Sequence, residues 1–355
     1  MTTNKKQPLN HICLIRLSAL GDCCHALAVI ENIQRSSPKT KITWVIGKTE
    51  HQLFKDIKGV EFIVADKKKP FESFFKIKKE LRGRCFDVLL NMHASMSANI
   101  ISLAIKAKKK VGFDRDRARD LQNLFCNEYI QPIKNQHVVD GMLEFTKYLN
   151  LDSAAKWTPL ILEPEEGFAR GYIHSNKVTC LISPCSSQRY GDQYNRSWSI
   201  NNFAELIKYL INLENLQVIM TGGNSPPEQL YSKELDDLFG NSILNLIGKT
   251  SIREMAALIK YSDFIISPDS GPAHIATIMG KPVIGLYAMS NPKRSGPYNS
   301  DEWLINKYDQ ALKVFMDKSP TEVKFGQKIK QPEAMDLIET RDVIEKVERL
   351  IKHES

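Results

Sequence analysis

The sequence predicts an α/β protein made of two similar halves, each a parallel sheet covered by helices on both faces. Short β-branched or apolar runs alternate with amphipathic helix patterns along most of the chain, and this alternation restarts after a segment rich in turn-forming residues. A chain of 355 residues also suits two domains better than one. We therefore expect two Rossmann-like domains in succession.

In the first half, five short apolar or β-branched runs predict strands, and amphipathic spacing between them predicts helices. The expected strands are 12–15, 42–46, 62–64, 88–91 and 110–112. The expected helices are 23–35, 50–56, 71–82, 95–107 and 138–149. Residues 152–164 carry breaker signals at Pro159 and Pro164, which predict the linker between the halves.

The second half repeats the pattern. Strands are expected at 179–183, 217–221, 243–246, 264–267 and 283–287, and helices at 201–213, 227–238, 252–261 and 272–279. Apolar residues at helical spacing predict a last helix within 333–352. The expected domains are therefore 1–160 and 161–332, followed by a C-terminal helix at 333–355.

The charge is concentrated in the first half. Residues 1–150 hold 26 Lys and Arg against 15 Asp and Glu, a net charge of +11, whereas the remainder holds 23 against 26, a net charge of −3. The first half is thus suited to an acidic partner such as nucleic acid, an anionic membrane or a phosphorylated glycolipid, and a solvated lysine-rich face explains it equally. The sequence has no long apolar run, so we expect neither export nor a membrane-spanning segment.

The seven cysteines show no Cys-x-x-Cys spacing and mostly lie in apolar runs. This pattern favours reduced, packed thiols over disulfides or a zinc site. Cys23 and Cys24 are most simply packing residues of a helix.

One stretch, residues 264–287, reads as strand, polar turn, helix and strand. Asp269 or Ser270 is suited to cap the helix, Pro272 to occupy its first position, and Gly280 to end it. Such a helix directs its N-terminal amides toward the C-terminal edge of the sheet, where open α/β sheets bind ligands. The turn is a candidate phosphate site, and simple capping explains the same residues.

Two further segments follow strands in the same way. Residues 16–26 (RLSALGDCCHA) come early in the first half, and residues 182–188 (ISPCSSQ), followed by Arg196-Ser197-Trp198, come early in the second. Together with residues 264–287, they resemble the glycosyltransferase family that contains the ADP-heptose:lipopolysaccharide heptosyltransferases. The resemblance spans residues 12 to about 298 and is nearest to the heptosyltransferase I type.

The resemblance implies a GT-B fold, in which two Rossmann-like domains face each other across a cleft and the C-terminal helix returns toward the first. It implies an inverting transfer of heptose from ADP-heptose to Kdo of a Kdo-lipid A acceptor in the lipopolysaccharide inner core. It also implies a cytoplasmic enzyme in peripheral contact with the anionic inner membrane, without cofactor, metal or nucleic acid.

Asp22 follows Gly21 at the predicted turn from strand to helix. A carboxylate there can accept the proton of an attacking sugar hydroxyl, and the resemblance implies the role of general base for it. The same residue type also caps helices, and a helix N-terminus stabilises the charged carboxylate by only about 0.3–1 kcal/mol. Capping and catalysis are therefore compatible.

The resemblance places donor binding in the second half. Arg196 matches a basic position that contacts the diphosphate, where a guanidinium can donate to two phosphate oxygens; residues inserted before it leave Arg189 as an alternative. Asp269 is expected to bind sugar hydroxyls or fix the turn, because two anions in one pocket repel each other. The full candidate set is Ser186, Ser187, Arg196, Glu228, Thr250, Asp269, Ser270, Gly271 and His274.

The acceptor candidates lie in the first half. Arg119 matches a family position near the acceptor, where it could bind a carboxylate or phosphate, and Arg115 and Arg117 are further candidates. His137 and His93 lie in matching segments, and a structural role explains each of them as well.

The same arginine-rich run contains the pattern Asp114-Arg115-Asp116. In many other glycosyltransferases an Asp-x-Asp pattern binds a divalent metal together with the sugar nucleotide. Here the alternating arginines are expected to pair with the carboxylates, and we predict no metal site.

Two other classes of function stay open on the sequence. A nucleotide-sugar epimerase could use the same two-domain scaffold and would convert its donor without an acceptor. A basic nucleic-acid-binding protein would explain the charge, but no stacking platform of aromatic residues accompanies the basic runs.

Overall fold

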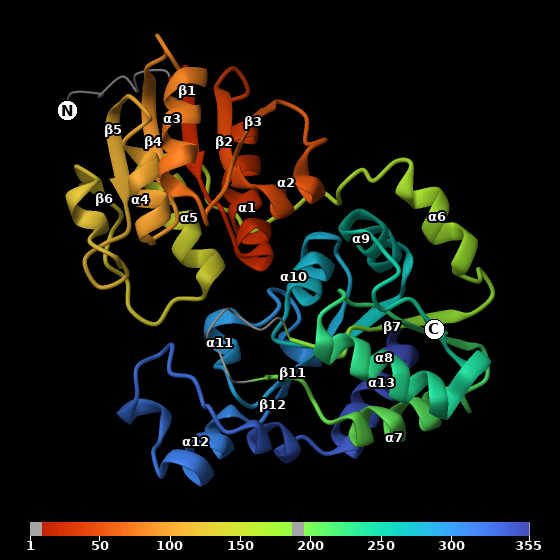
Figure 1. The fold of residues 1–355 in the computed structure, drawn as a ribbon. Coiled ribbons are helices and arrows are strands. Elements are labelled where there is room, and N and C mark those ends of the chain that lie inside the picture. Colours follow the sequence, from red (N-terminus) through yellow and green to blue (C-terminus); the bar gives the residue numbers. More distant parts are fainter. Residues whose placement is uncertain (1–8, 187–194, 355) are drawn as a thin grey trace. The chain divides into compact units, whose positions relative to one another are not determined.

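The computed structural model describes residues 9–186 and 195–354. The chain divides into two compact units, 1–157 and 158–355, each an α/β unit with its own sheet (Figure 1). The division lies inside the segment 152–164, which carries the breaker signals.

The first unit contains one parallel sheet of six strands in the order β3-β2-β1-β4-β5-β6. Its strands are β1 (His11–Ile15), β2 (Lys41–Gly47), β3 (Val60–Ala65), β4 (Phe86–Asn91), β5 (Ala107–Gly112) and β6 (Glu128–Tyr129). Its helices are α1 (Leu20–Ser36), α2 (Lys48–Phe54), α3 (Pro70–Glu80), α4 (Met96–Ser102) and α5 (Val138–Tyr148), with a 3₁₀ turn at Gln122–Leu124.

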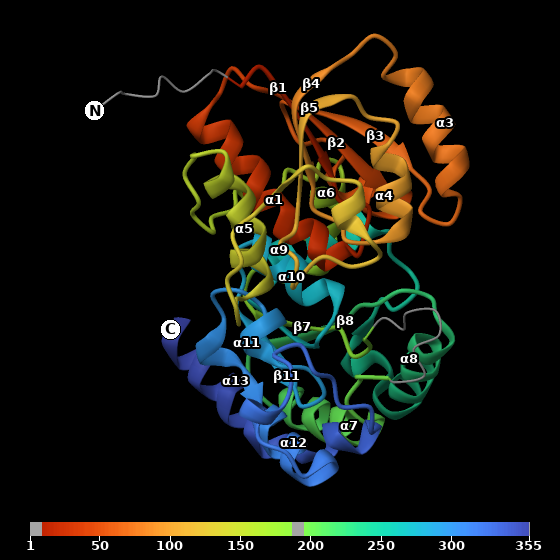
Figure 2. The same cartoon turned by 90° about the vertical axis from the view of Figure 1, so that its left-hand side faces the viewer.

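Helices cover both faces of this sheet, as its apolar strands require. Figure 2 shows α1 and α5 on one side and α3 and α4 on the other. On the second side, Ile77 of α3 and Ile101 of α4 are fully buried in the cluster that contains Cys13 and Ile15 of β1. A strand buried on both faces is the usual consequence of helical crossovers in a parallel sheet.

The second unit repeats this plan, with strand order β12-β11-β10-β7-β8-β9. Its strands are β7 (Val178–Ile182), β8 (Leu216–Met220), β9 (Leu244–Asn245), β10 (Phe264–Pro268), β11 (Val283–Tyr287) and β12 (Ile305–Asn306). Its helices are α6 (Glu165–Tyr172), α7 (Ile200–Leu210), α8 (Pro226–Phe239), α9 (Ile252–Tyr261), α10 (Gly271–Ile278), α11 (Pro292–Ser295), α12 (Tyr308–Met316) and α13 (Thr340–Glu354).

Short 3₁₀ segments complete the second unit, at Gly240–Ser242, Asp301–Trp303, Pro320–Glu322 and Pro332–Leu337. The helix expected within 333–352 is thus a 3₁₀ turn followed by α13. Val343, Val347 and Leu350 of α13 are fully buried in the core of this unit, and α13 packs against α7 and β11. The return of this helix toward the first domain remains an expectation.

The strands of the structure depart from the predicted ones at three places. The helix expected at 95–107 ends at Ser102, and β5 begins at Ala107 rather than residue 110. Lys108 and Lys109 in β5 are exposed, so this part of the strand lacks the apolar pattern that identifies strands in sequence. The two-residue strands β6 and β12 were not predicted, because an edge pairing of two residues leaves no periodic signal.

Two helix starts that affect candidate site residues also differ from expectation. Helix α1 begins at Leu20, so Asp22 is the third residue of its first turn and not the residue before it. Helix α10 begins at Gly271, which moves Pro272 to its second position. Gly280 follows α10 with φ +70°, the left-handed conformation that ends many helices.

All seven cysteines are free thiols, as expected, and all but Cys85 are buried. Cys23 and Cys24 are fully buried on α1, and burial raises the pKa of Cys185 to about 12 and that of Cys126 to about 11. Among the described residues, no helix has both the length and the hydrophobicity to cross a bilayer.

Helix α6 is fastened to α9 by polar contacts of Glu166. Lys260 Nζ lies 2.7 Å from Glu166 Oε1, and Tyr261 donates its hydroxyl to Glu166 Oε2 at 2.7 Å. Lys260 also donates to the backbone oxygen of Leu160. The hydrogen bonds from Lys260 and Tyr261 lower the pKa of Glu166 from 4.5 to about 2. The ionised carboxylate therefore stabilises the fold.

Replacing this carboxylate changes how stability depends on pH. A depressed folded-state pKa stabilises the protein above about pH 4.5, and this stabilisation is lost as the pH falls toward 2. We expect Glu166→Gln to lose about 1–2 kcal/mol in the free energy of unfolding at pH 7. This deficit should shrink between pH 4.5 and 2, measured by urea unfolding, with exposed Glu214→Gln as the control. An equal deficit at pH 7 and pH 2.5 would contradict this role.

Candidate functional site

Both sheets reverse their strand order at one point, which is where an open α/β sheet forms its ligand site. In the first unit the chain runs outward from β1 to β3 and then crosses to β4 on the other side of β1; in the second it does the same from β7 to β10. The loops that follow the two central strands diverge at this point. Asp22 follows β1, and Ser186 and Asp269 follow β7 and β10.

Asp22 is held by a guanidinium and by its own helix. Its carboxylate forms an ion pair with Arg16 and accepts a hydrogen bond from the Ala19 amide at 3.3 Å. Arg16 is 8% exposed and donates through Nη1 to the backbone oxygen of Met92 at 2.7 Å. The capping interpretation of Asp22 therefore holds in part, and the same contacts fix the direction of its carboxylate. The sequence analysis did not identify Arg16 as its partner.

A second buried carboxyl lies near this pair. Glu50 of α2 is 8% exposed, and burial raises the pKa of its carboxyl, which Arg16 lowers and Asp22 raises through their charges. Gly47 makes this packing possible, because a Cβ there would lie 2.2 Å from the Leu17 carbonyl oxygen and 2.5 Å from Glu50 Oε2.

The two histidines considered for the acceptor side have structural contacts. Nδ1 of His93 accepts a hydrogen bond from the Leu17 amide at 3.1 Å, which ties the loop after β4 to the loop after β1. His137 caps α5, its Nδ1 accepting from the Val139 amide at 3.1 Å. These contacts agree with the structural alternative for both residues.

The arginine-rich loop separates into fixed and exposed residues. Arg117 pairs with Asp114 and donates to the backbone oxygen of Gln131 at 2.7 Å, so it holds the loop. Arg115 and Arg119 are exposed, and among the described residues neither guanidinium forms a hydrogen bond or ion pair. Arg115 and Arg119 are thus better placed than Arg117 to bind a partner.

In the second unit, Arg196 and Asp269 lie together at the C-terminal edge of the sheet. Arg196 Nε is 3.5 Å from Asp269 Oδ2, and Arg196 Nη2 donates to the Asp269 backbone oxygen at 3.2 Å. Both side chains are largely buried, with 11% and 16% exposed. Ser290, after β11, donates its hydroxyl to Asp269 Oδ2 at 2.9 Å. Asp269 is therefore engaged by two neighbours at the turn.

Ser186 fixes the backbone beside Arg196. Its hydroxyl accepts a hydrogen bond from the Arg196 amide at 2.9 Å, and its own amide donates to Ser197 Oγ at 3.0 Å. Asn195 accepts from the Ser197 amide at 2.9 Å, and Trp198 is fully buried. Ser187 and the alternative phosphate residue Arg189 lie outside the described residues.

The turn before α10 is a candidate anion site without a side-chain cap. The hydroxyl of Ser270 lies 2.7 Å from that of Ser267 and does not cap the helix. The first amides of α10, beginning at Gly271, have no partner within the helix, and they carry its positive partial charge. His274, in the next turn, is 7% exposed and so belongs largely to the interior.

Glu228 and Thr250 lie after the outer strands of the same sheet. Glu228 accepts hydrogen bonds from the Gly223 amide at 2.6 Å and the Ser225 amide at 2.9 Å, so it holds the turn that opens α8. Thr250 precedes α9, and its buried Oγ1 has no hydrogen-bond partner among the described residues. The structure thus gives Glu228 a capping role and leaves a buried hydroxyl at Thr250.

The sequence analysis missed Arg16, Asn195, Ser197 and Ser290. Arg16 and Ser197 were inside the quoted motifs, and a search for a cation within a few residues of Asp22 could have found Arg16, six positions before it. Ser290 contacts Asp269 from the loop after the neighbouring strand β11. No sequence signal links two residues 21 positions apart before the strand order is known.

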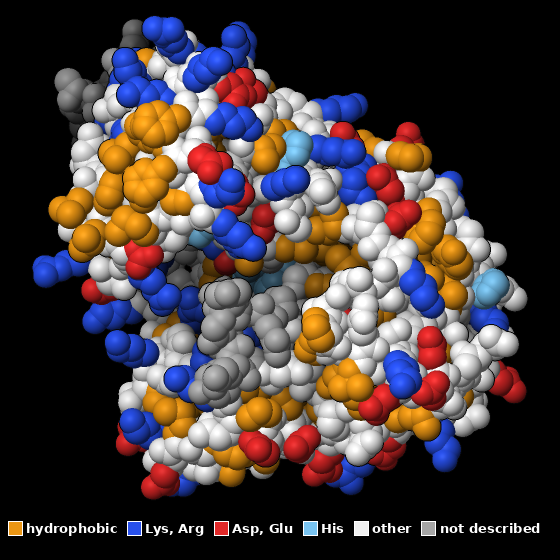
Figure 3. Space-filling model, in the orientation of Figure 1, with side chains coloured by type: hydrophobic (Ala, Val, Ile, Leu, Met, Phe, Trp, Pro, Cys, Tyr) orange, Lys and Arg blue, Asp and Glu red, His pale blue; other side chains and the backbone are white. Residues whose placement is uncertain are grey.

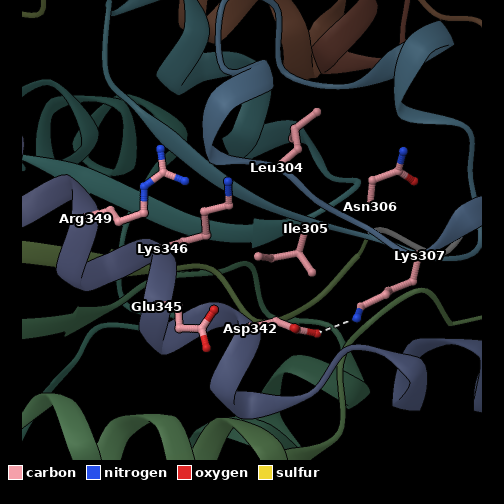
Figure 4. A pocket seen from close by; sticks show the side chains of 8 residues that line it. All are labelled: Leu304, Ile305, Asn306, Lys307, Asp342, Glu345, Lys346 and Arg349. Atoms are coloured by element: carbon pink, nitrogen blue, oxygen red, sulfur yellow. Dashed lines mark ion pairs between the residues drawn. The ribbon is translucent and has the colours of Figure 1, made fainter.

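A separate surface pocket of about 240 Å³ lies between β12 and α13 (Figure 4). Lys307 pairs with Asp342 at 2.7 Å, and Arg349 pairs with Glu302 at 3.0 Å, so these cations are already engaged. None of the predicted site residues lines this pocket. Within 9–186 and 195–354, no group of three or more His, Cys, Asp or Glu side chains is arranged to hold a metal ion.

The contact between Arg16 and Asp22 can be measured without any ligand. Their side chains are only 10% and 25% exposed. We expect a double-mutant cycle of Arg16→Gln and Asp22→Asn, followed by urea unfolding, to give a coupling of about 1–2 kcal/mol. The exposed pair of Lys69 and Glu72, neutralised in the same way, should couple by less than about 0.5 kcal/mol. Equal coupling in the two cycles would refute a fixed ion pair at Asp22.

The comparisons with known proteins identify the family of the chain. The model of glycosyltransferase family 9 (heptosyltransferase) matches residues 74–323. The lipopolysaccharide core heptosyltransferase OpsX of Haemophilus influenzae is 38% identical over 340 residues, which cover 96% of each chain. Lipopolysaccharide heptosyltransferase 1 of Salmonella typhimurium is 21% identical over 314 residues, 85% of this chain and 95% of that protein.

Solved structures support the fold. The E. coli heptosyltransferase WaaC with ADP superposes with a TM-score of 0.72 at 17% identity, covering 96% of this chain and 99% of that one. The glycosyltransferase family 9 structure from Veillonella parvula gives a TM-score of 0.78 at 20% identity, covering 98% and 99%. The predicted fold class, α/β of the GT-B type with two Rossmann-like units, is confirmed.

The family match excludes the epimerase and nucleic-acid-binding alternatives as the main function, because it assigns the chain to enzymes that transfer a sugar. The chain belongs to glycosyltransferase family 9, the heptosyltransferases.

Proposed function

We propose that this heptosyltransferase transfers heptose from ADP-heptose to a Kdo residue of the lipopolysaccharide inner core, with inversion at the anomeric carbon. The observation that carries the proposal is the largely buried guanidinium of Arg196 beside the N-terminus of α10, since both favour an anion at the C-terminal edge of the second sheet. The core heptosyltransferase OpsX, at 38% identity, supports the lipopolysaccharide acceptor.

In this proposal the diphosphate of ADP lies at Arg196, Ser186 and the first amides of α10. Arg196 Nε is buried, and apart from its ion pair with Asp269 at 3.5 Å it forms no hydrogen bond among the described residues. A phosphate oxygen would supply the missing hydrogen bond. Asp269 would accept hydrogen bonds from hydroxyls of the heptose, with Ser290 fixing its carboxylate. Thr250 would lie at the adenine and Glu228 at the ribose.

Asp22 is the proposed general base. The acceptor hydroxyl oxygen would attack the anomeric carbon as its proton passes to Asp22, and the bond from that carbon to the diphosphate oxygen would break on the opposite side. Arg16 and the Ala19 amide hold the carboxylate in a fixed direction, so that it can take the proton. The electron pair of the broken bond would remain on ADP, where Arg196 and α10 stabilise it.

The acceptor is proposed to bind the first unit through Arg115 and Arg119. Kdo carries a carboxylate, and guanidinium groups bind carboxylates and phosphates through paired hydrogen bonds. The net charge of +11 in residues 1–150 favours such an anionic acceptor. Because this acceptor is attached to lipid A, we place the enzyme at the cytoplasmic face of the inner membrane, in peripheral contact with it.

Two variants separate the roles of base and donor site. Asp22→Ala should lower single-turnover transfer by about 10²–10⁴-fold, because it removes the proton acceptor. ADP affinity should stay unchanged, because the residues proposed to bind ADP all belong to the second unit. Arg196→Gln should weaken ADP binding by about 10–100-fold, because it removes a charged donor to the diphosphate. Transfer is followed by mass spectrometry of the product, and ADP binding by calorimetry.

The matched controls are Asp56→Ala, an exposed carboxylate of the first unit, and Arg341→Gln, an exposed arginine of the second unit. Both should transfer heptose and bind ADP as the wild type does. Offering UDP- and GDP-sugars in place of ADP-heptose, with Kdo-lipid acceptors that do or do not carry phosphate, tests the identity of both substrates. Intact turnover in Asp22→Ala would reject the mechanism.

A further inference from the structure

Helix α3 presents two aromatic rings to solvent. Phe71 and Phe75 are 66% and 67% exposed, whereas Ser73 and Ile77 of the same helix are buried. Residues four apart lie on one face of a helix, so the two rings are neighbours on the outer side of α3. Burial of the opposite face already attaches α3 to the first unit, and the fold does not account for the exposed rings.

Basic residues share that outer face. Lys78 and Lys79 follow Phe75 by three and four residues, which places them one turn beyond it on the same side, and both are exposed. Residues 67–82 hold seven Lys and Arg against two Glu. One of these, Glu72, is paired with Lys69 at 3.1 Å. The exposed rings are therefore surrounded by a net positive charge.

The exposed apolar surface continues onto the neighbouring elements. Helix α4 packs against α3, and Ser97 donates its hydroxyl to the Lys67 backbone oxygen at 2.9 Å. The Met96 amide donates to Asp120 at 3.0 Å, which brings the next loop alongside α4. Three leucines on these segments are more than half exposed: Leu103, Leu121 and Leu124. Figure 3 shows apolar side chains gathered on this side of the first unit, among basic ones.

We propose that this surface, formed by residues 67–82, 96–103 and 121–124, docks on an anionic lipid bilayer. Aromatic and leucine side chains can enter the boundary between head groups and acyl chains, while lysines and arginines around them contact lipid phosphates. The combination of exposed rings and surrounding cations fits a bilayer better than an apolar protein partner, because the cations would lose their hydration in an apolar interface.

The link between this surface and the acceptor rests on the proposed function. Residues 114–120, which carry Arg115 and Arg119, run directly into Leu121 of the surface. A surface docked on the bilayer would therefore hold the candidate acceptor arginines close to the head groups. The sugar of a lipid-anchored, anionic acceptor would also lie next to the head groups.

Binding to vesicles tests the surface without donor or acceptor. The full-length protein is sedimented with vesicles of phosphatidylethanolamine and phosphatidylglycerol, or of phosphatidylcholine alone. We expect binding to the anionic vesicles only. Binding should be weaker at 0.5 M than at 0.1 M salt, because the screening length is about 10 Å at 0.1 M and shortens as salt is added. Phe71→Ser/Phe75→Ser should lower the partition coefficient by about tenfold or more. Lys78→Gln/Lys79→Gln should lower it by about fivefold for each charge.

The matched control is Leu230→Ser/Leu238→Ser, which removes two exposed apolar residues from α8 of the second unit. It should bind vesicles as the wild type does, and thermal unfolding should show that all variants fold. Wild-type affinity of Phe71→Ser/Phe75→Ser for anionic vesicles would overturn the proposal, as would equal binding of the wild type to both vesicle types. A dimeric wild type that becomes monomeric in Phe71→Ser/Phe75→Ser would also overturn it, because the occupant would then be a second copy.

A transfer assay separates this proposal from the proposed function. Phe71→Ser/Phe75→Ser should retain the kcat/KM of the wild type on a water-soluble Kdo acceptor and lose activity on an acceptor embedded in vesicles. Failure of the wild type to transfer heptose would reject the proposed function and leave the vesicle result standing. Equal loss on both acceptors would overturn the membrane role.

Discussion

The strand order of the two sheets is the constraint on which the account of this enzyme depends. The order in which strands are added reverses once in each sheet. The loops after β1 and β4 in one unit, and after β7 and β10 in the other, therefore diverge at the C-terminal edge. Residues that are far apart in sequence meet there because they follow adjacent parallel strands. Arg196 and Asp269, 73 positions apart, contact each other for this reason.

At this C-terminal edge, each sheet has an aspartate in contact with an arginine. In the first unit the pair is Arg16 and Asp22, and in the second it is Arg196 and Asp269. Removing two charges from water is costly, and only contacts with further partners make such pairs favourable. The backbone oxygens of Met92 and Asp269 provide these contacts for the two guanidinium groups. The two pairs therefore contribute more to the orientation of the charged side chains than to the stability of the fold.

The sequence predicted the fold because buried parallel strands are short apolar runs, and it proposed candidate positions because the turns after these strands are polar. It could not identify contacts that depend on the strand order, such as that of Ser290 with Asp269. The sequence analysis also placed Asp22 before the helix, because the first turn of α1 has no conventional cap. The residue before the helix, Ala19, has no side-chain acceptor, and its amide donates a hydrogen bond to the Asp22 carboxylate. The lysine-rich start of β5 was missed because exposed lysines hide its alternation.

The most direct measurement of the central claim is hydrogen exchange of the full-length protein with and without ADP. If the donor binds at the reversal of the second sheet, amides in residues 184–186, 195–198 and 269–274 should exchange more slowly with ADP bound. Protection confined to 304–307 and 342–349, which line the pocket between β12 and α13, would contradict the account, because no residue of the proposed donor site lines that pocket.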